Sequence, residues 1–129
     1  MSRLDETRPF IPVRIAVLTV SDTRALADDK SGDLLVSRLT EAGHELGARA
    51  IVHDDEVQII TTLRGFIEMA DIDCVIATGG TGLTGRDVTP EAFRAVFDKE
   101  IDGFGEMFRF LSFQKIGTSS LQSRAVAGV

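Results

Sequence analysis

The sequence has a single cysteine and contains neither tryptophan nor tyrosine. This residue, Cys74, lies in an apolar run that is predicted to be a buried strand. Because Cys74 has no possible partner within the chain, an internal disulfide is excluded and a reducing compartment is favoured. No apolar run approaches the roughly 18 residues that a membrane-spanning helix needs. The start of the chain also lacks the charged-then-apolar layout of a signal peptide. These absences predict a cytoplasmic protein with no membrane association.

Basic residues are also few, since 14 Lys and Arg stand against 20 Asp and Glu and the formal net charge is −6. Nucleic-acid binding needs a basic footprint, and neither a run of basic residues nor Trp or Tyr for base stacking is present. No nucleic-acid partner is therefore expected. An anionic ligand must be met by local groups, which are loop N–H groups and the side chains of Arg24, Lys30, Arg86 and Lys115.

What the chain does contain is an alternation of strand-like and helix-like apolar patterns. With 129 residues, 43% of them hydrophobic, it is long enough for one domain with its own core. Residues 1–13 are predicted to be an extended lead-in and residues 14–129 the folded domain. The alternation predicts an α/β fold, a three-layer αβα arrangement around a doubly wound, mostly parallel sheet. We expect strands at 15–20, 46–52 and 74–77, and helices at 31–42, 55–70, 89–97, from 102–106 onward, and at 121–127.

Residues at the helix ends suggest how the helices begin. The loop 25–30 is acidic and expected to be exposed, and Ser31 is predicted to cap the helix that follows. Asp55 is a candidate cap for the second helix, since Gln58 stands at the capping-box position. Thr89 is predicted to cap the next helix, with Pro90 at its first position.

Four of the eight phenylalanines crowd into ten residues near the C-terminus. They are Phe104, Phe108, Phe110 and Phe113. Two interpretations remain open for them, the core of the domain and the face of an oligomer. Within the expected helix, Met107, Phe108 and Leu111 are predicted to point inward.

The stretch 77–91 combines the end of a strand, a glycine-rich loop and the start of a helix. Glycine can adopt positive φ and brings the backbone close to a ligand, and free loop N–H groups can hold a phosphate. The hydroxyls of Thr78, Thr81 and Thr84 and the guanidinium of Arg86 add donors around Gly79, Gly80 and Gly82. The pattern is neither GxxxxGK[ST] nor GxGxxG, so neither standard nucleotide-binding motif applies.

Asp87 follows this loop and can be interpreted in two ways. A carboxylate beside a phosphate site repels the ligand unless a cation lies between them, and Mg²⁺ is the usual cation. Alternatively, the glycines make only a tight connection and Asp87 locks the turn through its own backbone. Loops that follow parallel strands lie at one edge of the sheet, so Asp22, Asp54 and Asp87 are candidates for a shared metal site. Asp22 and Asp54 can equally be turn or cap residues.

Taken together, these residues resemble the molybdenum cofactor biosynthesis proteins of the MoaB/MogA type, which share a molybdopterin-binding domain. The resemblance covers nearly all of the chain from Arg14 onward, and GGTG followed by DVTPEA and GFGE is specific in combination. The matching stretches are 16–22, 28–32, 51–54, 78–82, 87–91, 103–106, 108–109, 117–118 and 123–124.

The resemblance implies a parallel-sheet fold, a trimer or a hexamer of trimers, and a role in molybdenum cofactor synthesis. Members of the MogA type transfer adenylate from Mg²⁺-bound ATP to the terminal phosphate of molybdopterin and release pyrophosphate. By motif, Asp54 and Asp87 match the family's essential aspartates and would hold Mg²⁺, and Gly79, Gly80, Thr81 and Gly82, with Thr78, match its phosphate-binding loop. Ser21, Asp22, Ser31 and Gly32 match loops that line the same pocket. Arg86, whose guanidinium suits phosphate oxygens, is a further candidate for binding there.

Family members also continue past the SRAVAG stretch, which implies that residues 14–129 are a domain lacking its C-terminal part. A non-catalytic molybdopterin-binding carrier or oligomeric scaffold is the alternative to an adenylyltransferase. Such a protein would keep the phosphate loop and have no turnover.

Overall fold

The computed structural model describes residues 4–23 and 25–129. Arg24, one of the basic side chains expected to meet an anion, and residues 1–3 of the predicted lead-in lie outside the described residues. The elements within the described part are β1 (Arg14–Val20), the 3₁₀ turn η1 (Leu26–Asp28), α1 (Lys30–Glu41), β2 (Glu45–Val52), α2 (Glu56–Glu68), β3 (Cys74–Thr78), α3 (Thr89–Arg94), α4 (Asp102–Ile116) and the 3₁₀ turn η2 (Gly117–Gln122).

β1 is the central strand of a parallel sheet with the order β2-β1-β3. Its continuous apolar run is buried from the second residue to the last, as expected for a strand covered on both faces. β2 has a neighbour on one side only and is less completely buried, as its alternating pattern indicated. The predicted doubly wound parallel sheet is confirmed.

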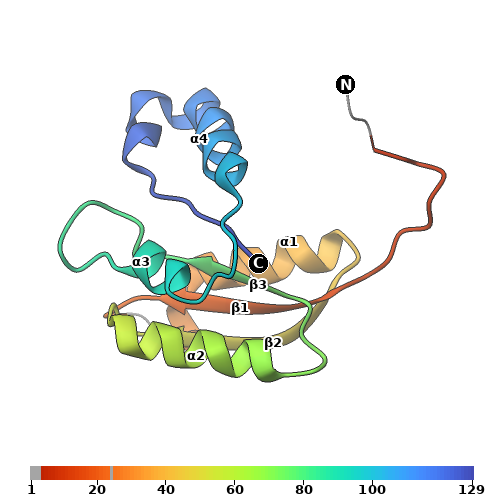
Figure 1. The fold of residues 1–129 in the computed structure, drawn as a ribbon, viewed down its shortest axis with the longest axis horizontal. Helices are drawn as coiled ribbons and strands as arrows, with labels where there is room; N and C mark the ends of the chain where they lie inside the picture. Colours follow the sequence, from red (N-terminus) through yellow and green to blue (C-terminus); the bar gives the residue numbers. More distant parts are fainter. Residues whose placement is uncertain (1–3, 24) are drawn as a thin grey trace.

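Helices lie on both sides of this sheet and give the predicted three layers (Figure 1). Successive residues of β1 point to opposite faces. One set packs against α2 and α3, and the other set packs against α1. The two core clusters consist of Ala16, Leu18, Val20, Ile59, Phe66 and Ala92 on the first face, and Ile15, Val17 and Leu39 on the second.

α4 stands off the three-layer body together with η2, against which it packs (Figure 1). The prediction that Met107, Phe108 and Leu111 point into the core is wrong, because 58%, 43% and 54% of these residues' surfaces are exposed. The exposed fraction of Phe110 is 61% and that of Phe113 is 54%. The phenylalanine-rich helix therefore presents apolar surface outward and is not core.

Two of the predicted helix caps are wrong and one is confirmed. α1 begins after Asp29, whose carboxylate accepts a hydrogen bond from an N–H of the first turn, so Ser31 lies inside the helix. α3 begins at Thr89 itself, and the Thr89 side chain makes no capping bond. Asp55 caps α2 as predicted, accepting from the N–H three residues further on at 3.0 Å.

The segment after η2 is extended, so the helix predicted at 121–127 is wrong. This segment returns to the chain just before α4, where Glu100 and Gly128 form an antiparallel bridge. The Ile101 N–H donates to the Ala127 carbonyl at 2.7 Å. Backbone pairing with residues 99–101 thus decides the conformation of this segment, which local helix signals could not reveal.

Exposure settles two further expectations. Cys74 was predicted to be buried, but it is the first residue of β3 and is exposed. Residues 4–12 lead away from the sheet and are largely exposed, as expected of a lead-in (Figure 1). Among the described residues, no helix has the length and apolar character to cross a membrane.

Candidate functional site

The loops after the three strands meet at the carboxyl edge of the sheet. Asp22 follows β1, Asp54 follows β2, and Asp87 lies in the loop after β3. The Asp54 N–H donates to Asp22 Oδ1 at 3.0 Å, and the guanidinium of Arg86 donates to Asp22 Oδ2. The Asp22 carboxylate therefore links all three loops.

Gly79 and Gly80 turn the chain at the end of β3 with φ values of +95° and +67°. Neither position has room for a side chain. A Cβ on Gly79 would lie 2.2 Å from the carbonyl oxygen of Val20. A Cβ on Gly80 would lie 2.2 Å from Thr89 Oγ1 and 2.9 Å from Asp54 Oδ1. The fold itself therefore requires glycine at both positions.

The Asp54 carboxylate lies against Gly80. Its Oδ1 atom and the Oγ1 atom of Thr89 are buried, and neither has a hydrogen-bond partner in the part of the chain that the structure describes. Burial raises the pKa of Asp54, and the negative charges of Asp22 and Asp87 raise it further. A buried acceptor without a partner is unfavourable, so this position favours a bound cation or hydrogen-bond donor.

Asp87 closes the second half of the loop. Its Oδ2 atom accepts from the Thr84 hydroxyl at 2.7 Å and from the Thr84 N–H at 3.2 Å. The Thr84 hydroxyl holds the pKa of Asp87 below its usual value, although burial acts in the opposite direction. Asp87 therefore fastens its own turn, as the structural interpretation expects. It also stays ionised, as a metal ligand must.

Arg86, a predicted phosphate-binding residue, is paired with Asp22 and its side chain is 76% exposed. The hydrogen bond from Arg86 lowers the pKa of Asp22, and the bond from the Asp54 N–H acts in the same direction. A phosphate group would compete with the Asp22 carboxylate for this guanidinium.

The remaining predicted residues of the phosphate loop lie at the same edge. Ser21 is half-buried, and its Oγ atom accepts from the N–H two residues on at 3.3 Å. Thr78 is the last residue of β3. The carbonyl oxygens of Thr81 and Gly82 accept hydrogen bonds from the backbone N–H and the Nε–H of Arg124, respectively.

Ser31 and Gly32 lie in the first turn of α1, and Gly32 is buried. A Cβ on Gly32 would lie 2.1 Å from Oδ2 of Asp29. The Asp29 side chain is fully buried and accepts from Thr19 Oγ1 at 2.9 Å and from Nη2 of Arg49 at 3.0 Å. Gly32 therefore makes room for a buried ion pair. The sequence placed Asp29 in an exposed loop, and that expectation is wrong.

Among the described residues, no three or more His, Cys, Asp or Glu side chains are grouped so that they could hold a metal ion by themselves. The three aspartates therefore do not form a complete ligand set. Asp54 Oδ1 lies 2.9 Å from the position of a Cβ on Gly80, and Asp87 Oδ2 lies 2.7 Å from that of a Cβ on Gly82. Two carboxylates thus flank one glycine loop. They suit Mg²⁺, which is usually bound by one or two carboxylates together with substrate phosphates.

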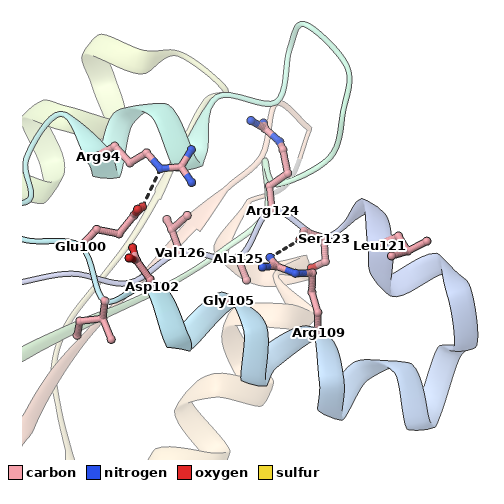
Figure 2. A pocket seen from close by; sticks show the side chains of 11 residues that line it. Arg94, Glu100, Asp102, Gly105, Arg109, Leu121, Ser123, Arg124, Ala125 and Val126 are labelled. Carbon is pink, nitrogen blue, oxygen red and sulfur yellow. Dashed lines mark hydrogen bonds and ion pairs between the residues drawn. The ribbon is translucent and has the colours of Figure 1, made fainter.

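A recess of about 280 Å³ lies between α4 and the extended segment after η2 (Figure 2). Arg109 donates to the carbonyl of Ser123 at 3.1 Å there, and Arg94 pairs with Glu100 at 2.8 Å. Arg124 lines this recess and also bonds the phosphate loop. The sequence indicated no role for Arg124, apart from its place in a stretch that matches the family.

The chain is similar to known proteins over most of its length. Residues 16–128 match the model of a family described as a probable molybdopterin binding domain. Molybdenum cofactor biosynthesis protein B of Escherichia coli K12 is 52% identical over 120 residues, which are 93% of this chain and 71% of that protein.

Solved structures give the same result. A crystal structure of a molybdenum cofactor biosynthesis protein B is similar with a TM-score of 0.91 and 46% identity, covering 95% of this chain and 76% of that one. The tungsten cofactor synthesizing protein MoaB from Pyrococcus furiosus has a TM-score of 0.81 and 39% identity, covering 91% and 72%. The chain therefore belongs to the family of the probable molybdopterin-binding domain, together with the MoaB proteins that its motifs resemble.

Proposed function

We propose that this protein takes part in molybdenum cofactor biosynthesis by binding molybdopterin and transferring adenylate from ATP to its terminal phosphate, with release of pyrophosphate. The observation that carries the proposal is the pair of carboxylates, Asp54 and Asp87, on either side of the glycine loop 79–82. Membership of the family and the names of its relatives support molybdopterin as the ligand.

The chemistry places modest demands on the protein. The nucleophile is an oxygen of the terminal phosphate of molybdopterin, which is already ionised at neutral pH and needs no strong base. It attacks the α-phosphorus of ATP, a new P–O bond forms, and the bond to the pyrophosphate oxygen breaks. Because both reactants are anions, the protein must position them and offset their repulsion.

The residues divide this work. The N–H groups of the glycine loop would hold a phosphate, since glycine leaves the backbone open to close approach. Asp54 and Asp87 would hold Mg²⁺, and the unpartnered, buried Oδ1 of Asp54 fits a cation ligand. When bound, Mg²⁺ would mask repulsion between the phosphates and stabilise the charge of the departing pyrophosphate. Arg86 would move from Asp22 to a substrate phosphate.

Other predicted residues would shape this edge of the site. Asp22 would keep the three loops together through its two carboxylate oxygens. Ser21 and Thr78 would present hydroxyls beside the loop. Ser31 and Gly32 would act from the first turn of α1, Gly32 chiefly by leaving room for the buried Asp29 carboxylate.

The second candidate is a molybdopterin-binding carrier without turnover. The observation in its favour is that the described residues include no complete set of metal-ligating side chains. A carrier needs the glycine loop and has no need of a metal. The two functions differ in what Asp87 contributes, since an enzyme loses turnover without Asp87 and a carrier has no turnover to lose.

The test is pyrophosphate release by the purified protein with molybdopterin, ATP and Mg²⁺. Asp87→Ala is expected to abolish release and to change molybdopterin affinity much less. Asp98→Ala, which removes an exposed carboxylate after α3, is the matched control and should behave like the parent. Binding of molybdopterin without any release by the parent protein would support the carrier and refute the enzyme.

We also propose that the protein forms a homo-oligomer, a trimer or a hexamer of trimers, through the exposed apolar surface of α4. The exposed apolar residues on this helix form a stretch too large to be ordinary surface scatter. A second copy of the chain is the proposed partner, because the same surface on each copy would be covered by its equivalent or by a neighbour in a closed ring. The exposed apolar residues of α4 are Phe104, Met107, Phe108, Phe110, Leu111, Phe113 and Ile116.

A further inference from the structure

One arginine outside the loop 79–87 bonds both ends of the second half of this loop, residues 82–87. Arg124 lies in the extended segment after η2, and its guanidinium points toward the loop and away from the recess partners Arg109 and Ser123 (Figure 2). Its Nε–H donates to the Gly82 carbonyl at 2.7 Å, and Nη2 donates to the Asp87 carbonyl at 2.7 Å. The guanidinium therefore bridges the first and last residues of the turn that carries the Asp87 carboxylate.

The same guanidinium is itself held in place. Nη1 of Arg124 donates to both carboxylate oxygens of Glu91, at 2.6 and 2.9 Å. The backbone N–H of Arg124 donates to the carbonyl of Thr81 at 3.3 Å. The Arg124 side chain is 28% exposed and the Glu91 side chain 42%, so these bonds are partly shielded from water. The three nitrogens of the Arg124 guanidinium thus donate to three separate acceptors, which are the Gly82 carbonyl, the Glu91 carboxylate and the Asp87 carbonyl.

The other bonds around Asp87 cannot replace this bridge. Those between Asp87 and Thr84 lie within the turn and fix its shape, but not its position on the body of the protein. Arg86 links the turn to Asp22, but its side chain is 76% exposed and its guanidinium is a candidate phosphate ligand. A link that the substrate would break cannot hold the loop during the reaction.

We infer that Arg124 is a positioning residue, which sets the second half of the phosphate loop and the Asp87 carboxylate for the reaction proposed above. The inference rests on that proposed function for its catalytic consequence, but not for its structural one. The positioning role requires the planar, forked guanidinium of arginine as well as its positive charge. A lysine ammonium is a single point donor and cannot reach Gly82, Asp87 and Glu91 together.

The inference also predicts which step suffers. The first half of the loop is fixed independently, because Gly80 accepts from the Thr89 N–H at 3.1 Å and Gly79 lies against Val20. Phosphate binding by this half should therefore survive the loss of Arg124. Catalysis should not, because a misplacement of about 1 Å can lower a rate by about 100-fold.

The experiment compares Arg124→Lys with Arg94→Lys in the full protein. Arg94 is the matched control, since it has the same charge and pairs with Glu100 instead of the loop. Hydrogen exchange is measured at the amides of Thr84 and Asp87, and kcat and KM for molybdopterin are measured by pyrophosphate release. In Arg124→Lys we expect exchange at both amides to accelerate by about 10-fold or more with little change in Tm. We expect kcat to fall by about 10- to 100-fold and KM to change less than about threefold.

The outcomes separate the inference from the proposed function. Parent-like exchange at Thr84 and Asp87 in Arg124→Lys would overturn the inference, as would an equal effect in Arg94→Lys. If Arg124→Lys does not fold, Glu91→Gln replaces it and should accelerate the same two amides, and no acceleration there would equally overturn the inference. A parent protein that releases no pyrophosphate would refute the enzyme only, because the exchange data would still decide whether Arg124 holds the loop.

Discussion

Gly32→Ala is expected to destabilise this protein, although alanine is the better helix former. Gly32 lies in the first turn of α1, where an added Cβ would lie 2.1 Å from Asp29 Oδ2 and 2.8 Å from Thr19 Oγ1. To reach an ordinary contact distance of about 3.5 Å, the carboxylate would have to move by about 1.4 Å. The movement would break its bonds to Thr19 and Arg49 and the cap of α1.

The balance of these effects gives the sign. Alanine in place of glycine in a helix gains up to about 1 kcal/mol. Loss of the cap costs about 1 kcal/mol, and a buried polar group left without its partner costs about 1–3 kcal/mol. Crowding adds a further 1 kcal/mol or more, roughly. The net loss should be about 2–4 kcal/mol, or a fall in Tm of roughly 8–16 °C for a domain of this size.

Gly65→Ala is the matched control, because Gly65 lies inside α2 and an added Cβ would meet nothing within 4 Å. It should stabilise the protein by about 0.5–1 kcal/mol. Urea and thermal unfolding followed by circular dichroism measure both variants, at one protein concentration because self-association would shift the midpoints. A Gly32→Ala variant as stable as the parent would refute the reasoning, as would a destabilised Gly65→Ala.

Three further predictions concern other groups. Although burial acts to raise the pKa of Asp29, hydrogen bonds from the Gly32 N–H, Arg49 and Thr19 hold this pKa below its usual value. The stability that this carboxylate contributes should therefore be present above about pH 4 and lost as the pH falls further. Asp29→Asn should flatten the acid limb of a plot of the urea unfolding midpoint against pH. Parallel plots for the parent and Asp29→Asn would contradict this prediction. Asp54→Asn should raise Tm, because the Asp54 carboxylate is partly buried and lies near the negative charges of Asp22 and Asp87, which destabilises the fold. On the proposed function it should also abolish pyrophosphate release. A lower Tm in Asp54→Asn would contradict this reasoning. Phe110→Asp, at a residue that is 61% exposed, should lower the mass measured by light scattering toward that of a monomer without lowering the helix content, and an unchanged mass would exclude this face as the interface.

Features set by local chemistry were predictable from the sequence. The central position of β1 followed from its unbroken run of branched apolar residues, and the cap of α2 followed from Asp55 and its spacing to Gln58. The meeting of the three loops followed from the topology of parallel strands. These inferences needed only neighbours in the chain and the general rules of α/β folds.

Features set by distant partners were not predictable. Ser31 was the predicted cap of α1, whereas the cap is Asp29, whose carboxylate is held by Arg49, 20 residues away. The apolar spacing of α4 indicated that Met107 and Phe108 would be buried. It could not reveal that α4 does not pack on the sheet and leaves both side chains exposed. The role of Arg124 depends on acceptors 33 to 42 residues earlier, which no local pattern reveals.

The crowding around Gly79 and Gly80 has a consequence for how such sequences diverge. Both glycines are required by the backbone turn and by the atoms packed against them, whether or not a ligand is ever bound. A descendant that lost its chemistry would still be selected to keep this glycine pair, because it would still have to fold. The glycine motif therefore records shared ancestry and architecture. The Asp54 side chain, whose buried Oδ1 atom has no partner among the described residues, is free to change in a descendant that does not carry out the proposed reaction. Asp87 is less free, because its carboxylate also fastens its own turn through Thr84. Genome surveys that sort active from inactive members should score position 54 rather than the motif.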